Sequence, residues 1–310
     1  MTRTRSYRII PAAGLAALLA GACIAVCSCK KEIPHSPYTN HEIALFPKEA
    51  LAATEPTTKA ETTLSTLDGS GFRASAVTVS GTTETAVWTN SLFTKSGDVF
   101  KGGHYWPTSN PGYSFYGSNS TLTYTTAGNT VTVPQGNTTD IVCAYKAAST
   151  YLTANSLNFQ HILSKITTVT VTAEAPYAIS NITISLVSTK TGGAYNLKTG
   201  AWIDLRPTAA TDRTLYTNAG TIASGSNHTG ANNDYLLVPG TYYLKATWTA
   251  TVNGFSKTFT SKLSTANYAF LAGKRNAITC ILSGDAKEIT FDVSVEDWGT
   301  NAIDLGELPE

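Results

Sequence analysis

The sequence predicts an all-β fold of two tandem β-sandwich domains, and three features indicate it. Charged residues make up only 14% of the 310-residue chain, against roughly a quarter in typical domains, whereas β-branched and aromatic residues, which suit a pleated surface, are abundant. Short runs of alternating apolar and polar residues recur through most of the chain, as strands with one buried face require. About 280 residues remain after an N-terminal signal, enough for two domains of roughly 100–150 residues.

Residues 1–28 have the organisation of a bacterial lipoprotein signal peptide. Three arginines precede an apolar run that ends in a group of cysteines, a pattern typical of a secretory signal rather than a membrane anchor. Cys29 is the predicted lipidation site, because a small serine precedes it and polar residues follow it. Cys27 follows a bulky valine, and Cys23 would leave an apolar mature terminus. An ordinary cleaved signal with a chance cysteine is the alternative.

Residues 29–59 are predicted to be a tether that carries one short strand. Prolines and charges directly after the lipidation site favour an extended linker. The run that contains Ile43, Leu45 and Phe46 is apolar and has a length suited to a strand. A stretch rich in Thr, Ala, Glu, Pro and Lys extends from there to Ala60, and we expect it to be accessible to proteases.

Residues 60–190 are predicted to form the first sandwich. Val169, Val171 and Ala173 alternate with threonines, which predicts a strand with one buried and one exposed face. Closely spaced aromatic residues near position 113 are expected to fill the core. The strand signals of this domain cover residues 63–67, 72–79, 99–107, 113–118, 141–145, 157–159, 166–173 and 179–187.

Residues 191–310 are predicted to form the second sandwich, followed by a tail. Glycines near position 192 and at position 200 punctuate the chain where the boundary is placed. In the last strand every second residue from 289 to 295 is apolar, so these side chains share one face. The strand signals cover residues 235–238, 241–252, 255–263, 277–282 and 288–298.

Cys143 and Cys280 lie inside apolar strand patterns, one in each predicted domain. We expect both to be small buried side chains without a bridge between them. The spacing of the cysteines offers no paired CxxC motif, so a zinc site is not supported.

The order of several motifs resembles that of a known family. DIVCAYK at 140–146 is followed by LNFQHILSKI at 157–166, and a YWP motif precedes YSFY. Further matches are YLLVPG with YYLKATW and, near the end, ITFDVSVEDW. Together these motifs resemble the fimbrillin-like lipoproteins of Bacteroidales, the type V pilins, over roughly residues 58 to 298.

The resemblance implies a transthyretin-like topology for both sandwiches. It also implies a structural subunit of a type V pilus (fimbria) that supports adhesion. Such a subunit is exported as a lipoprotein to the outer membrane and the cell surface, and it assembles with other pilin subunits by donor-strand exchange. The resemblance does not say whether this subunit is stalk, tip or anchor.

The resemblance further implies cleavage by a trypsin-like protease, and Lys59 is the matching position. Thr-Lys-Ala stands here in place of the family's Thr-Arg-Ala. Two alternatives follow: the protease tolerates lysine, or the subunit keeps its N-terminal arm. In the first case the strand with Ile43, Leu45 and Phe46 would be displaced.

By the same resemblance, the replacing strand would come from the C-terminus of a neighbouring subunit. In residues 299–310 the candidate anchors are Ile303 and Leu305, two apart, and Leu308, which is off that register. Two or three anchors are few for a permanent joint. Which terminus donates the strand stays open.

Several classes of function are not supported. A net charge of +1 is too small to attract the phosphate backbone of nucleic acid. The chain has no HExxH, GxSxG or GxxxxGK[ST] motif, and its five histidines are scattered. We therefore predict no enzyme activity, no metal and no cofactor. His161 is expected to satisfy backbone groups at a turn rather than to act in catalysis.

The alternative function is a surface lipoprotein that binds glycans on exposed aromatic rings. Five tryptophans and fifteen tyrosines make this possible. The observation that separates it from the pilin hypothesis is whether four tryptophans are buried or line an open platform, namely Trp88, Trp106, Trp202 and Trp248.

Overall fold

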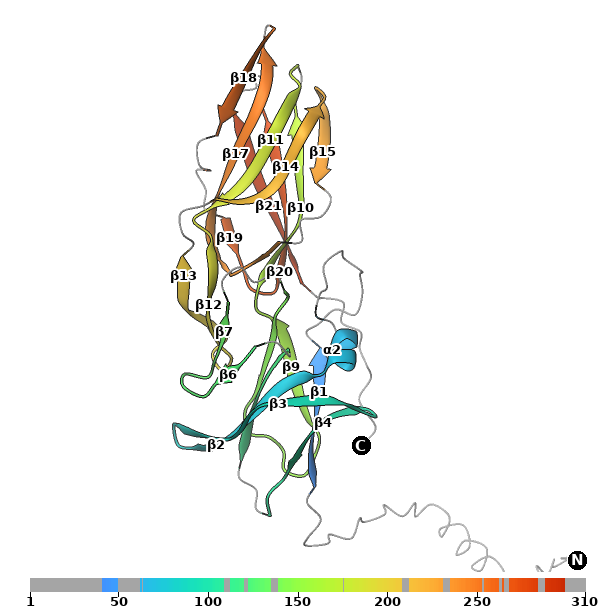
Figure 1. Cartoon of the computed structure of the whole chain (residues 1–310), viewed down its shortest axis with the longest axis vertical. Coiled ribbons are helices and arrows are strands. Elements are labelled where there is room, and N and C mark those ends of the chain that lie inside the picture. Colours follow the sequence, from blue (N-terminus) through green and yellow to red (C-terminus); the bar gives the residue numbers. More distant parts are fainter. Residues whose placement is uncertain are drawn as a thin grey trace, which may run out of the picture. The chain divides into compact units, whose positions relative to one another are not determined.

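The protein is all-β, as predicted. The computed structural model describes residues 41–49, 62, 64–108, 112–119, 122–134, 139–174, 176–207, 212–230, 235–252, 254–261, 264, 268–283 and 288–298. Within these ranges the chain forms strands and a single short helix (Figure 1). The predicted two-domain, transthyretin-like arrangement stays a prediction.

Seven strands close into a barrel in the order β1-β4-β3-β2-β5-β8-β9. Every neighbouring pair is antiparallel except β1 with β9, which is parallel. The bounds of these strands are β1 Glu42–Glu49, β2 Phe72–Ser80, β3 Thr83–Ser96, β4 Val99–Tyr105, β5 Tyr113–Asn119, β8 Val142–Lys146 and β9 Asn155–His161.

Two further sheets share one apolar core. The first has the order β15-β10-β20-β21 with β16 beside β10, and the second has the order β14-β11-β17-β18 with β19 beside β17. Their bounds are β10 Ser164–Ala173, β11 Ile179–Val187, β14 Arg213–Ile222, β15 Ser226–Gly230, β16 Tyr235–Leu237, β17 Gly240–Val252, β18 Phe255–Thr260, β19 Tyr268–Phe270, β20 Lys274–Leu282 and β21 Ile289–Asp297. Side chains from both sheets meet in this core, as in a sandwich.

A small fourth sheet has the order β13-β12-β7-β6. Its strands are β6 Tyr124–Thr125, β7 Thr130–Val133, β12 Lys190–Asn196 and β13 Ala201–Pro207. Its buried side chains join an apolar cluster with residues of β5 and β8 and with Trp298.

Strand pairing does not break at the predicted boundary between residues 190 and 191. β10 and β11 precede it, yet β10 pairs in parallel with β20 and β11 pairs with β14 and β17. Across the same boundary, β12 pairs with β7. The sheets are therefore built from segments on both sides of residue 190, and the limits of independent domains stay a prediction.

The strand signal at 63–67 is wrong, because residues 64–67 belong to the helix α2, Leu64–Ser70. Leu67 is fully buried in the barrel core, whereas Ser65 and Thr66 are exposed. Gly71 ends the helix in the left-handed conformation, with φ +71°, a region that favours glycine. Its N–H donates to the Leu67 carbonyl at 2.8 Å.

The alternation predicted for the strand at 166–173 is confirmed. Val169, Val171 and Ala173 are buried, and the threonines between them are partly exposed. Cys143 and Cys280 are buried and free, also as predicted. Burial raises the pKa of the Cys280 thiol to about 12 and that of Cys143 further, so both stay protonated at neutral pH.

Candidate functional site

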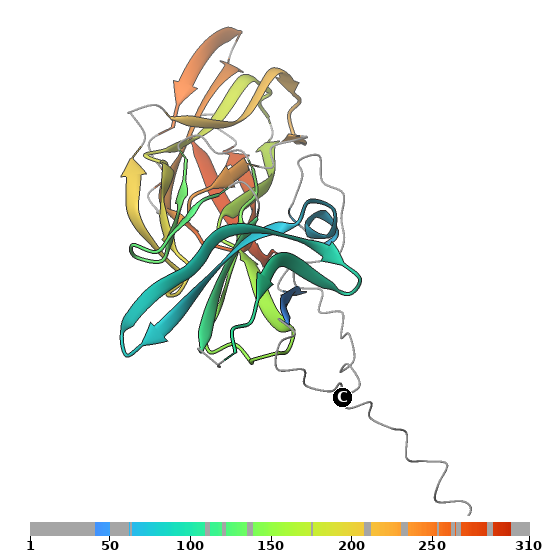
Figure 2. The ribbon, with the colours of Figure 1, turned by 60° about the horizontal axis from the view of Figure 1, so that its bottom comes forward.

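The N-terminal strand β1 closes the barrel (Figures 1 and 2). It lies between β4, to which it is antiparallel, and β9, to which it is parallel. Ile43 and Leu45 are fully buried and belong to the same apolar core as Phe159 of β9 and Phe100 of β4. The segment predicted to be a short apolar strand is thus an integral part of the barrel wall.

Side chains on the two faces of β1 differ, as the period of a strand requires. Phe46 is half-buried and lies on the opposite face from Ile43 and Leu45, and Lys48 is exposed. Only two of the three predicted arm residues therefore share the core face. We call the place that β1 occupies between β4 and β9 the β1 site.

Polar contacts fix the start of β1. The Glu42 carboxylate accepts a hydrogen bond from the Gly103 N–H at 3.1 Å and lies 3.3 Å from the Lys101 ammonium. The carbonyl of His41 accepts from the Trp106 N–H at 2.8 Å. All of these partners lie on β4 or directly after it, so this end of β1 is held by one neighbour.

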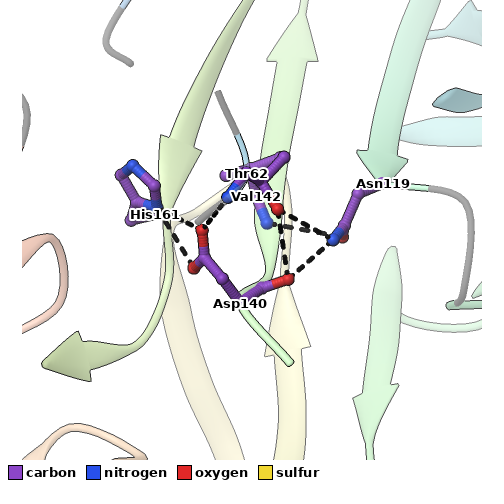
Figure 3. Close-up of polar contacts among 5 residues, drawn as sticks. All are labelled: Thr62, Asn119, Asp140, Val142 and His161. Carbon is purple, nitrogen blue, oxygen red and sulfur yellow. Dashed lines mark hydrogen bonds and ion pairs between the residues drawn. The ribbon is translucent and has the colours of Figure 1, made fainter. Parts of the chain in front are cut away.

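A buried acid–imidazole pair lies beside the other neighbour of β1 (Figure 3). Asp140 precedes β8 and is 1% exposed, and His161 ends β9 and is 6% exposed. The His161 Nδ1 lies 2.9 Å from one carboxylate oxygen of Asp140 and 3.1 Å from the other. Next to the pair, Val142 of β8 is paired with His161 in the sheet.

Two polar residues complete the surroundings of Asp140 (Figure 3). The Thr62 backbone N–H donates to a carboxylate oxygen at 2.8 Å. The Asn119 side-chain amide donates to the Asp140 carbonyl at 2.7 Å, and its oxygen accepts from the Val142 N–H at 3.4 Å. The carboxylate thus contacts Thr62 and His161, and the backbone carbonyl contacts Asn119, so these polar groups of the buried residue have hydrogen-bond partners.

The imidazole also joins the end of the last strand. The rings of His161 and Trp298 stack with centroids 4.0 Å apart and planes 6° apart. Trp298 directly follows β21, and its backbone N–H donates to the Gly273 carbonyl at 2.8 Å. The Lys165 ammonium lies 5.7 Å from the centre of the indole ring. The pair thus contacts residues from the beginning and from the end of the described chain.

Sequence reasoning had singled out His161 as a structural residue but had not paired it with Asp140. The available signal was an acidic residue directly before one apolar strand and a histidine at the end of the next. Nothing in the sequence pattern pointed to Thr62 or Trp298. The predicted residues Cys29, Lys59, Ile303, Leu305 and Leu308 lie outside the described part of the chain.

The described residues offer neither a cluster of metal ligands nor a membrane-spanning helix. Within them, no group of three or more His, Cys, Asp or Glu side chains could hold a metal ion. No helix among them is both long and apolar enough to cross a membrane.

The tryptophans do not form an open platform. Trp106 and Trp248 are buried in separate cores. Trp88 is half-buried and stacks on His104 with centroids 4.2 Å apart. Trp202 is half-buried as well, and its indole N–H donates to the Ile162 carbonyl at 3.2 Å. The burial and half-burial of these four tryptophans therefore do not favour glycan binding.

The fold and the site define a class: an all-β protein whose N-terminal strand completes a barrel. The model of the fimbrillin-like family matches residues 53–298, so the chain belongs to that family. The match begins after β1 and ends at Trp298. No curated protein matches the chain.

Solved structures with a similar fold include two proteins from Bacteroides species. A fimbrial protein from Bacteroides vulgatus ATCC 8482 aligns with a TM-score of 0.60 and 15% identity, covering 84% of this chain and 100% of that one. A candidate cell adhesion protein from Bacteroides uniformis ATCC 8492 aligns with a TM-score of 0.50 and 19% identity, with the same two shares. At these identities the likeness shows the fold.

Proposed function

We propose that the protein is a structural subunit of a type V pilus, carried at the cell surface and supporting adhesion. Membership of the fimbrillin-like family supports this role. The fold likeness to a fimbrial protein is consistent with it. The partners are other pilin subunits, in a homopolymer or a heteropolymer, and the subunit has no catalytic task.

The position of β1 is the observation that carries the mechanism. Loss of β1 would leave β4 and β9 as edges with unpaired N–H and C=O groups, and it would uncover the core side of the barrel. Such an edge is a template for a strand from another chain. We propose that assembly replaces β1 in this way, by donor-strand exchange.

Release of β1 requires a cut between it and the body of the protein. Lys59 lies in the connection between β1 and Thr62, which is bound to Asp140. A trypsin-like protease that accepts lysine would cut there, and without such a protease the subunit would keep its arm. Arg73 is a poor alternative, because it lies within β2 and its guanidinium donates to the Asn90 carbonyl at 2.7 Å.

The C-terminal tail has the spacing that the β1 site requires. Ile43 and Leu45 fill the core from positions two apart, and Ile303 and Leu305 are also two apart. The tail therefore has as many core-facing apolar side chains, two, as the strand that it would replace. Leu308 is off this register and would face away from the core.

The signal sequence suggests how the protein reaches the cell surface. We propose that Cys29 is acylated and that the lipid anchors the protein in the outer membrane. A single acyl chain binds a membrane only marginally, whereas several chains anchor a protein stably. Cutting at Lys59 would then also free the subunit from its anchor.

A polymerisation assay tests the proposal. Protein produced from residue 30 is treated with limiting trypsin and followed by light scattering, and the product termini are read by mass spectrometry. We expect a cut after Lys59, loss of the arm and growth of oligomers. Truncation after Trp298, or replacement of Ile303 and Leu305 by aspartate, should abolish growth, whereas Leu308→Asp should retain it. Equal growth without the tail would contradict the C-terminal donor.

A further inference from the structure

We infer that the Asp140–His161 pair holds β9 in place when β1 is absent, so that β9 is ready to receive the incoming strand. The inference rests on the proposed function, because it assumes that β1 leaves the barrel. It assigns Asp140 and His161 the role of positioning residues for strand exchange.

The pairing of β9 is uneven along its length. Five residues, Asn155 to Phe159, are paired with β1. Only Gln160 and His161 are paired with β8, and the next link in the same direction is the hydrogen bond from the Ile162 N–H to the Ile141 carbonyl at 3.1 Å. When β1 leaves, the backbone of β9 is attached to its remaining neighbour at one end only.

The apolar side chains of β9 do not replace this attachment. Leu157 and Phe159 stay in the barrel core, where Phe159 packs edge-on against Phe72. Apolar contacts of this kind are not directional, so they keep the side chains buried without setting the backbone register. Register matters here, because a shift by one residue turns every side chain to the other face.

The Asp140–His161 pair acts at the attached end of β9. It joins His161, the last residue of β9, to Asp140, which lies two residues before β8. The His161 Nδ1 is 2.9 Å from a carboxylate oxygen of Asp140, and both residues are buried. When one partner of a buried hydrogen-bonded pair is removed, the other polar group is left buried without a partner, which is unfavourable. The pair therefore fixes the end of β9 more firmly than two backbone pairings alone.

Nothing that supports the pair is lost with the arm. Thr62 lies on the retained side of the proposed cut, and Asn119 belongs to β5. Trp298, which stacks on His161, precedes the tail. The same geometry around Asp140 can thus persist after residues 1–59 have departed.

Hydrogen exchange with mass spectrometry tests the inference on the peptide that covers β9. The variants are Asp140→Ala, the milder Asp140→Asn in case the first does not fold, and Glu84→Gln as a control. Glu84 is a second mostly buried carboxylate, and its partners Lys198 and Tyr116 lie in the turn after β12 and in β5. Each protein is measured intact and after removal of β1, by trypsin and independently by the substitution Leu45→Asp.

Loss of β1 should accelerate exchange in β9 more strongly in the Asp140 variants than in the wild type or in Glu84→Gln. After loss of β1, exchange in β9 should become about ten- to a hundredfold faster in Asp140→Ala than in the wild type, the scale of a buried polar group left without its partner. Asp140→Asn should show a smaller acceleration than Asp140→Ala, and Glu84→Gln should change exchange in β9 by the same factor before and after loss of β1. Equal effects of the Asp140 variants before and after loss of β1, or no effect at all, would overturn the inference.

Two further outcomes separate this inference from the proposed function. If neither trypsin nor Leu45→Asp exposes β1 to exchange, β1 is not removable and both fail. In the second experiment, which requires that β1 can be removed, a synthetic peptide of residues 299–310 is added to wild-type protein that has lost β1. If β9 stays protected only through Asp140 but no peptide binds, the positioning role stands and the tail is not the donor.

Discussion

Glu84 of β3 and Lys198, in the turn after β12, join the barrel to the small fourth sheet through an ion pair of 2.5 Å. The Glu84 side chain is 8% exposed and also accepts from the Tyr116 hydroxyl at 2.8 Å. Burial by itself raises the pKa of Glu84, but the hydrogen bonds from Lys198, Tyr116 and Asn129 together outweigh it and lower the pKa below 4.5.

This relationship predicts a pH-dependent contribution to stability. Because the pKa of Glu84 is lower in the folded state, its contribution is complete above about pH 4.5 and is lost as the pH falls through the folded-state value. Glu84→Gln should therefore lower the free energy of unfolding at pH 7, and the difference from the wild type should shrink below pH 4.5. Urea unfolding across this range measures it, and a difference that stays constant would contradict the prediction.

The two faces of β1 predict unequal effects of substitution. Leu45→Ala should lower the free energy of unfolding of the intact barrel by about 2–5 kcal/mol, because it leaves a cavity in the core. Phe46→Ala removes a half-buried ring from the other face and should cost less. In protein that has been cut after Lys59 and has lost β1, the two variants and the wild type should be equally stable. Urea unfolding followed by tryptophan fluorescence makes the comparison.

Two glycines with positive φ should respond differently to alanine. Gly81 has φ +61° and open space around a built Cβ, so Gly81→Ala should cost only the strain of the left-handed region, about 1–2 kcal/mol. Gly71 has φ +71°, and a Cβ there would lie 2.4 Å from the Phe93 carbonyl oxygen. Gly71→Ala should therefore cost about 1–3 kcal/mol more. Thermal unfolding of both variants tests this, and equal losses would show that the backbone near Phe93 can move.

Lipidation at Cys29 predicts that loss of this cysteine changes how the protein partitions between detergent and water. Cys29→Ser should leave an unlipidated precursor that moves to the aqueous phase of a detergent partition, whereas Cys27→Ser, the matched control, should remain in the detergent phase. Mass spectrometry of the mature N-terminus would confirm the acylated residue. If Cys29→Ser still partitions like the wild type, another cysteine carries the lipid.

The sequence by itself determined the class of fold, the family and the local character of many strands. Composition and period-two alternation predicted an all-β protein, and Val169, Val171 and Ala173 are buried on one face as that alternation requires. These features are predictable because alternation is a local property of a strand whose two faces meet different surroundings. Ile43 and Leu45 were predicted to be strand residues because they lie in a short apolar run of strand length.

The tertiary structure decided which strands meet. Neither the parallel pairing of β1 with β9 nor that of β10 with β20 has a local signal, because each joins segments far apart in the chain. The helix at 64–70 was missed because the segment is short and its two leucines, Leu64 and Leu67, are too few to establish a period. The cluster around Asp140 draws its members from Thr62 to Trp298. A buried polar side chain needs hydrogen-bond partners, and only the folded chain brings such distant residues together.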